Sequence, residues 1–416
     1  MSTSTIIPTV AVEEDFRTRA HNALGDSQLR NNFRTAMDSL MTKRAAAFSD
    51  AHEREHLRAL GNSIRARALS KLPDLLEQLE KNLTRNGVTV HWAETVDEAN
   101  GIVLSIIRAH EARQVIKGKS MVSEEMEMNH FLEARDIECL ESDMGEYIVQ
   151  LAGEHPTHIL APAMEKTAEQ VAELVARVEG APVSPDRQEL TATARRRLRE
   201  TFLSADVGIT GVNFGVAETG SIVLVENEGN ARLVSALPRV HVALMGMERV
   251  VPTLADTAVL LRLLARSATG QKLTSYTTVI TGPRRPREQD GPEELHVVVL
   301  DNGRSSLLHG PYREMLNCIR CGACINVCPV YRKAGGGAYG PVLSGPMGAI
   351  LGPLLAGLGQ APDLAHASSL CGACTAACPV RIPLHDLLLD LRRDLSEQGV
   401  APRGERLGFW LWSLAW

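Results

Sequence analysis

Seven of the eight cysteines in the chain lie between Cys318 and Cys378, and this crowding is the first sign of chemistry in the sequence. The first group has the spacing C-x2-C-x2-C-x3-C-P and consists of Cys318, Cys321, Cys324 and Cys328, followed by Pro329. In bacterial iron–sulfur proteins with this spacing, three thiolates hold one cluster and the fourth cysteine binds a second cluster. Thiolates are soft anionic ligands that suit iron. The first group therefore predicts iron–sulfur ligands.

The second group repeats this spacing with a serine at its first position and consists of Ser368, Cys371, Cys374 and Cys378, followed by Pro379. Crossed ligation gives cluster one a full set of thiolates, namely Cys318, Cys321, Cys324 and Cys378. Cluster two keeps three thiolates, namely Cys328, Cys371 and Cys374. Two iron–sulfur clusters are therefore expected. The second is either a 3Fe-4S centre or a 4Fe-4S cluster whose fourth iron binds Ser368, water or another non-thiolate ligand.

Zinc is the main alternative cofactor, because paired C-x-x-C units also bind zinc. Zinc sites do not need three successive cysteines and a Cys-Pro pair in each group, so iron–sulfur clusters are favoured. Roughly 40 residues separate the two groups, which favours an α-helical ferredoxin domain over a compact one. Two further questions stay open: whether the clusters are purely structural, and whether nearby cations tune their potentials or are solvated. These cations are Arg320, Arg332, Lys333 and Arg381.

Composition limits the class of protein that carries these cysteines. The 416 residues hold 44 Lys+Arg and 50 Asp+Glu, giving a net charge of −6, with 44% hydrophobic and 23% charged residues. These values are ordinary for a soluble globular protein of two or three domains, and they exclude wholesale disorder. Mild acidity argues against nucleic-acid binding through phosphate neutralisation. Without a visible secretory signal or transmembrane segment, we expect a cytoplasmic protein, where clustered cysteines bind metal rather than form disulfides.

Hydrophobic periodicity divides the chain into regions that must position the cysteines. Residues 12–85 have helical spacing, which predicts two or three amphipathic helices. Residues 86–300 alternate short apolar runs with helical stretches, which is typical of a mostly parallel sheet covered on both faces. The runs predicted as strands are 88–91, 157–160, 222–225, 241–245, 277–280 and 295–300, and the predicted helices include 122–134 and 164–178.

The remaining segments are predicted as loops and connectors. Residues 281–293 are dense in Pro, Gly and charge and predict a surface loop, and residues 335–362 predict a packed connector between the cysteine groups. The predicted domains are an N-terminal helical segment over 1–60, an α/β domain over 61–300, an α-helical ferredoxin domain over 301–398 and an apolar tail over 399–416.

The cysteine groups, together with the runs 211–230 (GVNFGVAETGSIVLVENEGN) and 290–304 (DGPEELHVVVLDNGR), resemble the lactate utilization protein B family. The resemblance covers about residues 60–400. Members of that family are the iron–sulfur subunit of a bacterial three-protein system that oxidises L-lactate to pyruvate and supports growth on lactate. The resemblance implies a lactate-utilisation domain of the sugar-isomerase and CoA-transferase type, with a parallel sheet, followed by the α-helical ferredoxin domain.

The resemblance also implies partners and a difference at the C-terminus. The partner subunits would be a cysteine-rich protein with CCG motifs and a second protein with a lactate-utilisation domain. Family members continue beyond the position at which this chain ends. The Trp-rich tail is therefore expected to be either a partner surface or a truncated core element.

Other candidate residues lie in the α/β region. Glu218 is a weak candidate nucleophile, because a glutamate is the nucleophile in related CoA-transferases; the alternative is that its segment only shapes a turn. Lys117 and Lys119 form a plausible anion cradle, with Ser123 as a helix cap. Structural roles are expected for the other polar groups: a hairpin turn at 227–230, core or boundary positions for His130, His241 and His296, and a strand core for Cys139.

Three functional hypotheses follow. The first is an electron-transfer subunit that passes electrons from lactate oxidation through its clusters. The second is a self-contained enzyme of the α/β domain, in which Glu218 and Lys117 or Lys119 contribute to catalysis and the clusters are accessory redox centres. The third is a redox-sensing regulator, which is disfavoured because two clusters exceed what a sensor needs and no basic patch is visible.

Overall fold

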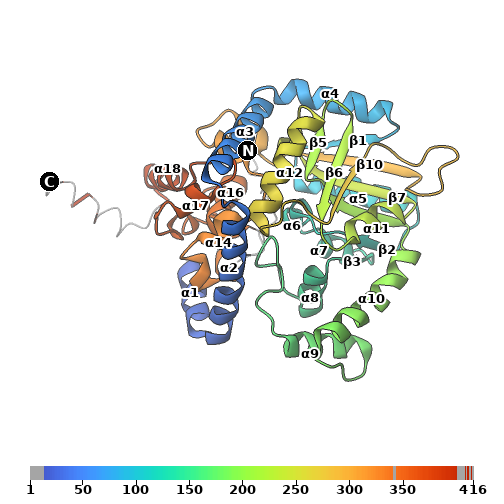
Figure 1. The fold of residues 1–416 in the computed structure, drawn as a ribbon, viewed down its shortest axis with the longest axis horizontal. Helices are drawn as coiled ribbons and strands as arrows, with labels where there is room; N and C mark the ends of the chain where they lie inside the picture. The colour runs from blue at the N-terminus through green and yellow to red at the C-terminus, as the bar shows by residue number, and fades with distance from the viewer. Residues whose placement is uncertain (1–13, 341–342, 401–407, 409, 412–413, 415–416) are drawn as a thin grey trace.

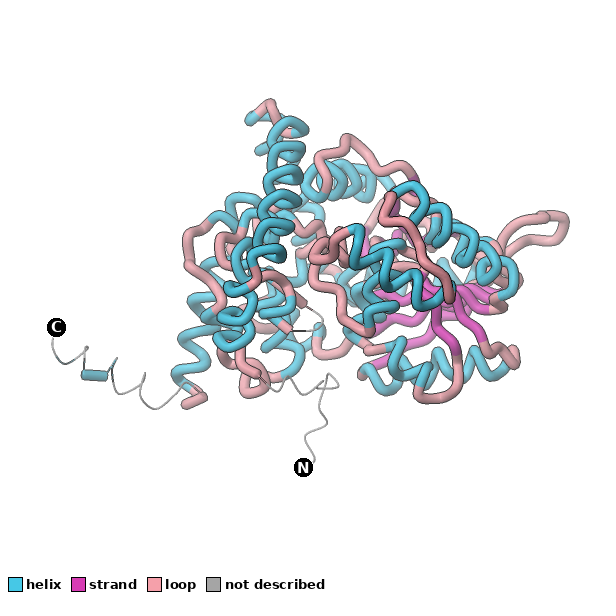
Figure 2. The backbone as a smooth tube through the Cα atoms, turned by 90° about the horizontal axis from the view of Figure 1, so that it is seen from below, coloured by secondary structure: helices cyan, strands magenta, loops and turns pink. Residues whose placement is uncertain are grey.

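The computed structural model describes residues 14–340, 343–400, 408, 410–411 and 414. The strands gather on one side of the molecule, and the cysteine-bearing helices lie on the other (Figures 1 and 2). The α/β architecture predicted from the alternating pattern is therefore confirmed.

Sheet A is six-stranded and entirely parallel, with the order β1-β10-β7-β4-β2-β3. Its strands are β1 (Thr89–Ala93), β2 (Gln114–Lys117), β3 (Glu138–Glu141), β4 (Val207–Gly211), β7 (Val240–Gly246) and β10 (Glu294–Leu300). Alternate residues of β10 enter two different cores: Val297 and Val299 pack on one face, and Val298 and Leu300 pack on the other. A strand that is buried on both faces has apolar residues at successive positions of its sequence. This pattern is why β10 could be predicted.

Helices cover both faces of sheet A. They are α5 (Val96–Ala109), α6 (Met121–Glu125), α7 (Met128–Glu133), α8 (Met144–Ala152), α9 (Ala168–Glu179), α10 (Arg187–Ser204) and α11 (Asn230–Ala236). Helices α5 and α7 pack on one face, whereas α10 and α11 pack on the other. Gly208 of β4 permits the close approach of α11, because a Cβ there would lie 2.1 Å from the carbonyl oxygen of Val234.

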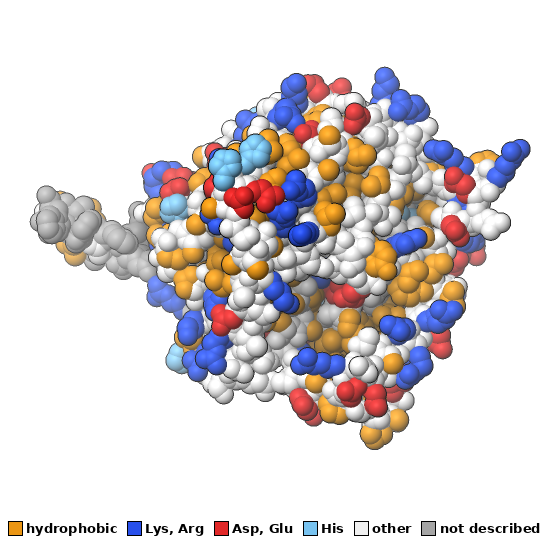
Figure 3. All heavy atoms as spheres, viewed as in Figure 1, with side chains coloured by type: hydrophobic (Ala, Val, Ile, Leu, Met, Phe, Trp, Pro, Cys, Tyr) orange, Lys and Arg blue, Asp and Glu red, His pale blue; other side chains and the backbone are white. Residues whose placement is uncertain are grey.

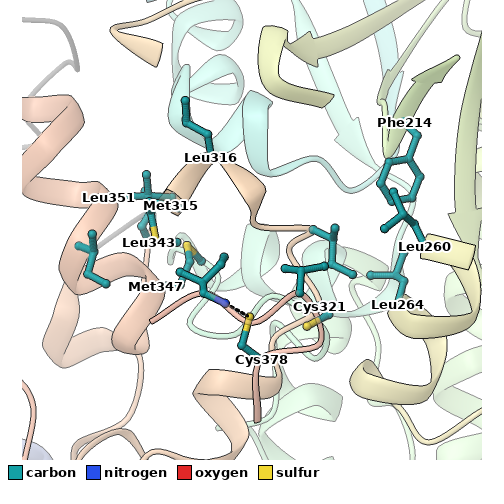
Figure 4. Packing of buried hydrophobic residues seen from close by; sticks show 14 of the residues in the cluster. Phe214, Leu260, Leu264, Met315, Leu316, Cys321, Leu343, Met347, Leu351 and Cys378 are labelled. Carbon is teal, nitrogen blue, oxygen red and sulfur yellow. Dashed lines mark hydrogen bonds between the residues drawn. The ribbon is translucent and has the colours of Figure 1, made fainter. Parts of the chain in front are cut away.

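A second, four-stranded sheet lies against this layer. Its order is β8-β5-β6-β9, and its strands are β5 (Phe214–Val216), β6 (Ser221–Glu226), β8 (Val250–Val251) and β9 (Tyr276–Ile280). The 3-10 turn η1 (Met247–Arg249) precedes β8, and helix α12 (Leu254–Ala268) follows it. Phe214 of β5 packs with Leu260 and Leu264 of α12, in a core that continues into the cysteine-bearing region (Figure 4).

The cysteine-bearing region is helical, as predicted. Its elements are α13 (Arg304–Leu308), η2 (Arg313–Asn317), α14 (Ala323–Val327), α15 (Tyr331–Ala334), η3 (Gly337–Tyr339), α16 (Gly345–Ala356), η4 (Leu364–His366), α17 (Ala373–Ala377) and α18 (Leu384–Glu397). Helix α16 is almost wholly buried and belongs to the predicted packed connector. Residues 281–293 form a surface loop, which confirms that prediction.

The N-terminal helices bridge the two regions. They are α1 (Phe16–Gly25), α2 (Ser27–Ala47), α3 (Ala51–Ser70) and α4 (Leu72–Arg85), one more than expected, since aspartate caps separate the first three. Helix α1 packs on α15, α2 packs on α14 and α15, and α3 packs on η2 and α12. The N-terminal helices therefore form part of the framework around the cysteines.

Several sequence predictions were wrong in detail. Residues 157–160 form a loop rather than a strand. His158 is buried there against the cysteine-bearing region, 2.9 Å from Asn326 of α14, and its neighbours are half-buried. The predicted helix over 122–134 is two short helices, separated where Glu127 adopts φ 48°. Helix α9 begins at Ala168 rather than Met164. The predicted tail lies mostly outside the described residues, and its described part is exposed at Trp410, Leu411 and Leu414.

Candidate functional site: two cysteine sets beside a sheet-edge cavity

The two cysteine loops have the same backbone conformation. Arg320 and Leu370, each one residue before the second cysteine position, adopt φ values of 58° and 54°. Gly322 and Gly372 then cap α14 and α17 at φ 72° and 76°, and the two helices pack together. Positive φ at a non-glycine residue is uncommon, so its recurrence marks a true structural repeat.

The repeat places Ser368 where the first loop has Cys318. The Cys318 sulfur accepts the N–H of Arg320 at 3.4 Å, and the Ser368 hydroxyl oxygen accepts the N–H of Leu370 at 3.1 Å. Ser368 is therefore positioned like a ligand, although its hydroxyl is a harder donor than a thiolate.

The first cysteine set surrounds one small cavity, lined by the cysteines predicted for cluster one: Cys318, Cys321, Cys324 and Cys378. Cys321 and Cys378 come from different loops and lie near each other in Figure 4, and both line this cavity. Burial and then the neighbouring Cys378 thiol raise the pKa of Cys321 to about 12, and burial raises the pKa of Cys378 to about 11. Thiols that resist ionisation in an apolar pocket become thiolates when a metal coordinates them. The donor set therefore fits an iron–sulfur cluster.

The second set lies nearer the surface and consists of Cys328, Cys371 and Cys374. Cys328 and Cys374 are buried, whereas Cys371 is exposed. Burial raises the pKa of Cys374, and the nearby thiols of Cys328 and Cys371 raise it further. Burial also raises the pKa of Cys324, and the Cys374 thiol of the other set raises this pKa further. The two sets are therefore close neighbours, with an outlet to solvent at Cys371.

Three arginines, one buried and two half-buried, hold the loops that carry these cysteines. The Arg58 guanidinium of α3 donates to the carbonyl oxygen of Cys378 at 2.9 Å, and Arg44 of α2 donates to that of Ala377 at 2.9 Å. Arg249 donates to the carbonyl oxygen of Cys318 at 3.1 Å. These cations fix the loop backbone and place positive charge beside a cluster whose charge is negative. Sequence reasoning missed them, because no local motif links them to loop residues that lie 69 to 333 positions away.

The four basic residues near the cysteines in sequence behave differently from one another. Lys333 is exposed, Arg332 pairs with Asp38, and the half-exposed Arg381 lies 3.3 Å from Glu55. Arg320 lines the first cysteine cavity, and its Nε atom has no hydrogen-bond partner among the described residues. Position in the sequence alone could not distinguish Arg320, which lines the cavity, from the other three basic residues.

A second cavity of about 250 Å³ opens between sheet A and the first cysteine set. Its walls come from the carboxyl ends of β2, β4 and β6, and they include Lys119, Asn213, Glu226, Asn230 and Arg249. Arg320 and Ile159 line both cavities, so the two are neighbours. Ligands of open parallel sheets bind outside the carboxyl ends of the strands, which makes this cavity a candidate ligand site.

The remaining candidates from the sequence are placed as follows. Glu218 lies on the surface, where its Oε2 atom accepts the N–H of Leu254 at 3.2 Å at the start of α12. Gly220 shapes the adjacent turn at φ 64°, against Asn82. The predicted hairpin at 227–230 is wrong, because the chain runs from β6 into α11, and these residues form part of the cavity wall.

The two candidate lysines have different surroundings. Lys117 is fully buried, with its Nζ atom 2.6 Å from Glu141 and 3.0 Å from Glu124. Although burial opposes its charge, these carboxylates hold its pKa well above the usual value. An anion cradle at Lys117 is therefore excluded, whereas Lys119 lines the sheet-edge cavity, 3.3 Å from Asp143. The cap of α6 is Ser120 rather than Ser123.

The histidines and the isolated cysteine have structural surroundings. His241 is buried 2.7 Å from Thr210, and Cys139 is buried in β3, both as expected. His296 is nearly buried beside His91. His130 is exposed, contrary to expectation, and pairs with Glu127 at 3.1 Å.

Comparison with known proteins agrees with this geometry. Residues 76–300 match the LUD domain family, and residues 314–382 match the 4Fe-4S dicluster domain family. Proteins named lactate utilization protein B from Bacillus thuringiensis (strain Al Hakam) and Bacillus cereus (strain AH187) are each 48% identical over 97% of this chain and 85% of their own length. This chain belongs to the lactate utilization protein B family.

A solved structure adds a weaker likeness. The crystal structure of a DUF162 family protein from Deinococcus radiodurans aligns with a TM-score of 0.32 and 16% identity, over 55% of this chain and 98% of that one. In the described part of this family member, no helix is long and apolar enough to span a membrane.

The placement of Ser368 leads to a spectroscopic prediction. A Ser368→Cys variant would give the second set a fourth thiolate at the position that Cys318 holds in the first. If the native centre has three irons, the variant is expected to gain about one iron per chain and to lose the EPR signal of the oxidised state. A Ser369→Cys variant is the control, because its exposed neighbouring position is not the ligand position. An equal gain of iron in both variants would contradict the assignment.

Proposed function

We propose that this chain is the electron-transfer subunit of a multi-protein system that oxidises L-lactate to pyruvate, supporting growth on lactate. The observation that carries the proposal is the division of seven cysteines into two adjacent sets with the crossed pattern of a two-cluster ferredoxin. The chain is similar in sequence to proteins named for lactate utilisation, and this similarity is our reason for proposing L-lactate as the substrate. We assign Cys318, Cys321, Cys324 and Cys378 to cluster one and Cys328, Cys371 and Cys374 to cluster two.

The positions of the two sets suggest a direction for the electrons. The first set is enclosed and adjoins the sheet-edge cavity, whereas the second reaches the surface at exposed Cys371. Electrons would enter from the cavity side at cluster one and leave from cluster two to a partner. When bound, the clusters supply one-electron steps; the protein's own residues orient them and limit water access. The partners we propose are the CCG-motif protein and a second lactate-utilisation-domain protein, in the cytoplasm.

Reconstitution of lactate oxidation from the separate proteins tests this proposal. The clusters of this chain absorb visible light and bleach on reduction, so their redox state can be followed directly. We expect L-lactate to bleach them only when both partner proteins are present, and D-lactate to serve as the control substrate. Rapid lactate oxidation by partners combined with a cluster-free chain would contradict a role in electron transfer.

One observation supports the second hypothesis, a self-contained α/β-domain enzyme: the 250 Å³ cavity lies directly beside the first cysteine set. That hypothesis predicts that L-lactate reduces the isolated chain. It would place any catalytic group on the cavity wall rather than at Glu218.

Glu218 provides a separate prediction. A Glu218→Gln variant keeps an oxygen that can accept the N–H of Leu254, so we expect lactate oxidation within about twofold of wild type and a stability change below about 0.5 kcal/mol. Turnover of the reconstituted system measures the first quantity, and thermal unfolding measures the second. A fall in rate of about 100-fold or more, with unchanged stability, would restore Glu218 as a catalytic candidate.

A further inference from the structure

We propose that His110, Glu294 and His296 form a zinc-binding site at the amino end of β10, outside the cysteine sets and the sheet-edge cavity. Side chains from a helix end and a strand converge there on one point. The chemical class of the ligand is a borderline divalent transition metal that takes imidazole and carboxylate donors, with zinc as the expected ion.

The sheet geometry explains why these residues meet. Glu294 and His296 are two residues apart on β10, so their side chains project from the same face of sheet A. Val298 continues this face and packs in the core beneath α5. Helix α5 runs over the same face and ends at Ala109, which brings its cap residue His110 above the two strand residues. The convergence is therefore fixed by the fold and does not depend on a mobile loop.

Two of the three donor-atom distances match tetrahedral zinc, and the third is bounded by the same group. The Nε2 atoms of His110 and His296 each lie 3.3 Å from the Oε2 atom of Glu294, and all three donor atoms lie within 4.8 Å of one another. Zinc bonds of about 2.0 to 2.1 Å in tetrahedral geometry separate two ligands by about 3.3 Å. An ion can therefore enter with little side-chain movement, and solvent access at the half-exposed Glu294 leaves the fourth position to water.

Contacts with a neighbouring histidine orient the His296 ring for metal binding. Its Nδ1 atom lies 3.1 Å from Nε2 of His91 on β1, and the two rings stack with centroids 5.3 Å apart. A partner on the second ring nitrogen fixes the orientation of a metal-binding histidine and here directs Nε2 toward Glu294, the other proposed ligand. The carbonyl end of α5 also favours a cation at this point.

Another His–Glu group provides a matched control. Glu127, His130 and His155 also lie within reach of one another, but His155 is 4.0 Å from Glu127 and the His130 side chain is 66% exposed. The distance from His155 to Glu127 is longer than tetrahedral ligation requires, and the exposed His130 would lose the most side-chain freedom on binding. We expect no tight zinc site there.

The test uses the full chain with its iron–sulfur clusters assembled, so that the cluster cysteines are occupied. After mild chelation, zinc chloride is titrated by calorimetry, and the bound zinc is examined by X-ray absorption. We expect one zinc per chain, with nitrogen and oxygen donors and no sulfur. The His110→Ala and Glu294→Gln variants, both altered at the protein surface, are each expected to weaken binding by at least about 100-fold, since losing an outer-shell partner alone costs 10- to 100-fold.

The His130→Ala variant is expected to bind zinc like wild type. Three results would overturn the proposal: no zinc bound by the cluster-loaded chain, zinc held by sulfur, or unchanged affinity in both His110→Ala and Glu294→Gln. A His110–Glu294–His296 group joined only by hydrogen bonds would give the first of these results. None of them would bear on the electron-transfer function, because the site lies apart from the cysteines.

Discussion

A Cys321→Ser variant is expected to lose cluster one, so that its iron content falls from about seven or eight atoms per chain to about four or fewer. Cys321 is buried in the cavity that it shares with Cys318, Cys324 and Cys378, and a serine hydroxyl is a much poorer iron ligand than a thiolate. Lactate oxidation by the reconstituted system should be nearly abolished. Iron and sulfide quantitation measures the loss, and near-ultraviolet circular dichroism checks that the α/β domain is still folded.

Cys139→Ser is the matched control for this experiment. Cys139 is the remaining cysteine of the chain, it is buried in β3, and burial raises the pKa of its thiol. This variant is expected to keep its full iron content and its activity at permissive temperature. A Cys321→Ser chain that retained all its iron and was reduced normally would show that the ligand assignment is wrong.

Replacing Arg65 by methionine is expected to lower the free energy of unfolding by about 3 to 5 kcal/mol and to weaken retention of cluster one. The Arg65 guanidinium is fully buried and donates to the carbonyl oxygens of Leu316 at 2.9 Å, Val250 at 3.1 Å and Asn317 at 3.4 Å. Methionine fills similar space but leaves these carbonyls without a donor, which costs about 1 to 3 kcal/mol for each buried group. The segment that leads into Cys318 would lose its attachment to α3.

Arg67 on the same helix provides the comparison. It is half-exposed and pairs with Asp256 at 2.6 Å, so an Arg67→Met change is expected to cost less than about 1 kcal/mol. Chemical unfolding measures both variants, and iron content after gel filtration measures cluster retention. Equal stability of the Arg65→Met and Arg67→Met chains would contradict the proposed role of Arg65.

Features set by short-range patterns could be predicted from the sequence. Cysteine spacing predicted two sets, and the structure brings Cys378 from the second loop into the cavity of the first. The apolar run of 295–300 predicted β10, because a strand buried on both faces has a distinctive composition. The repeated cysteine spacing also identified Ser368 as a fourth ligand position, because Ser368 has the place in the second group that Cys318 has in the first.

Features set by contacts distant in sequence could not be predicted. His158 in the run 157–160 is buried against Asn326 of the cysteine-bearing region, and periodicity alone does not separate such a packed loop from a strand. Arg65 and Leu316 are 251 residues apart, and nothing in either segment indicates that they meet. The polar residues at 227–230 resemble a turn by composition, whereas the fold makes them part of a cavity wall.

Charged side chains are distributed over the face of the molecule shown in Figure 3. Acidic and basic side chains are interspersed on this face, and no single-sign region dominates it.

We infer that the two iron–sulfur clusters lie close enough to exchange electrons. Anaerobic reconstitution, followed by iron and sulfide quantitation and EPR before and after dithionite, tests it most directly. We expect about seven or eight irons per chain and, in the reduced sample, a spectrum broadened by interaction between two centres; a signal from the oxidised sample would identify the second as a 3Fe centre. Bound zinc in place of iron, or about four irons in a single isolated centre, would contradict it.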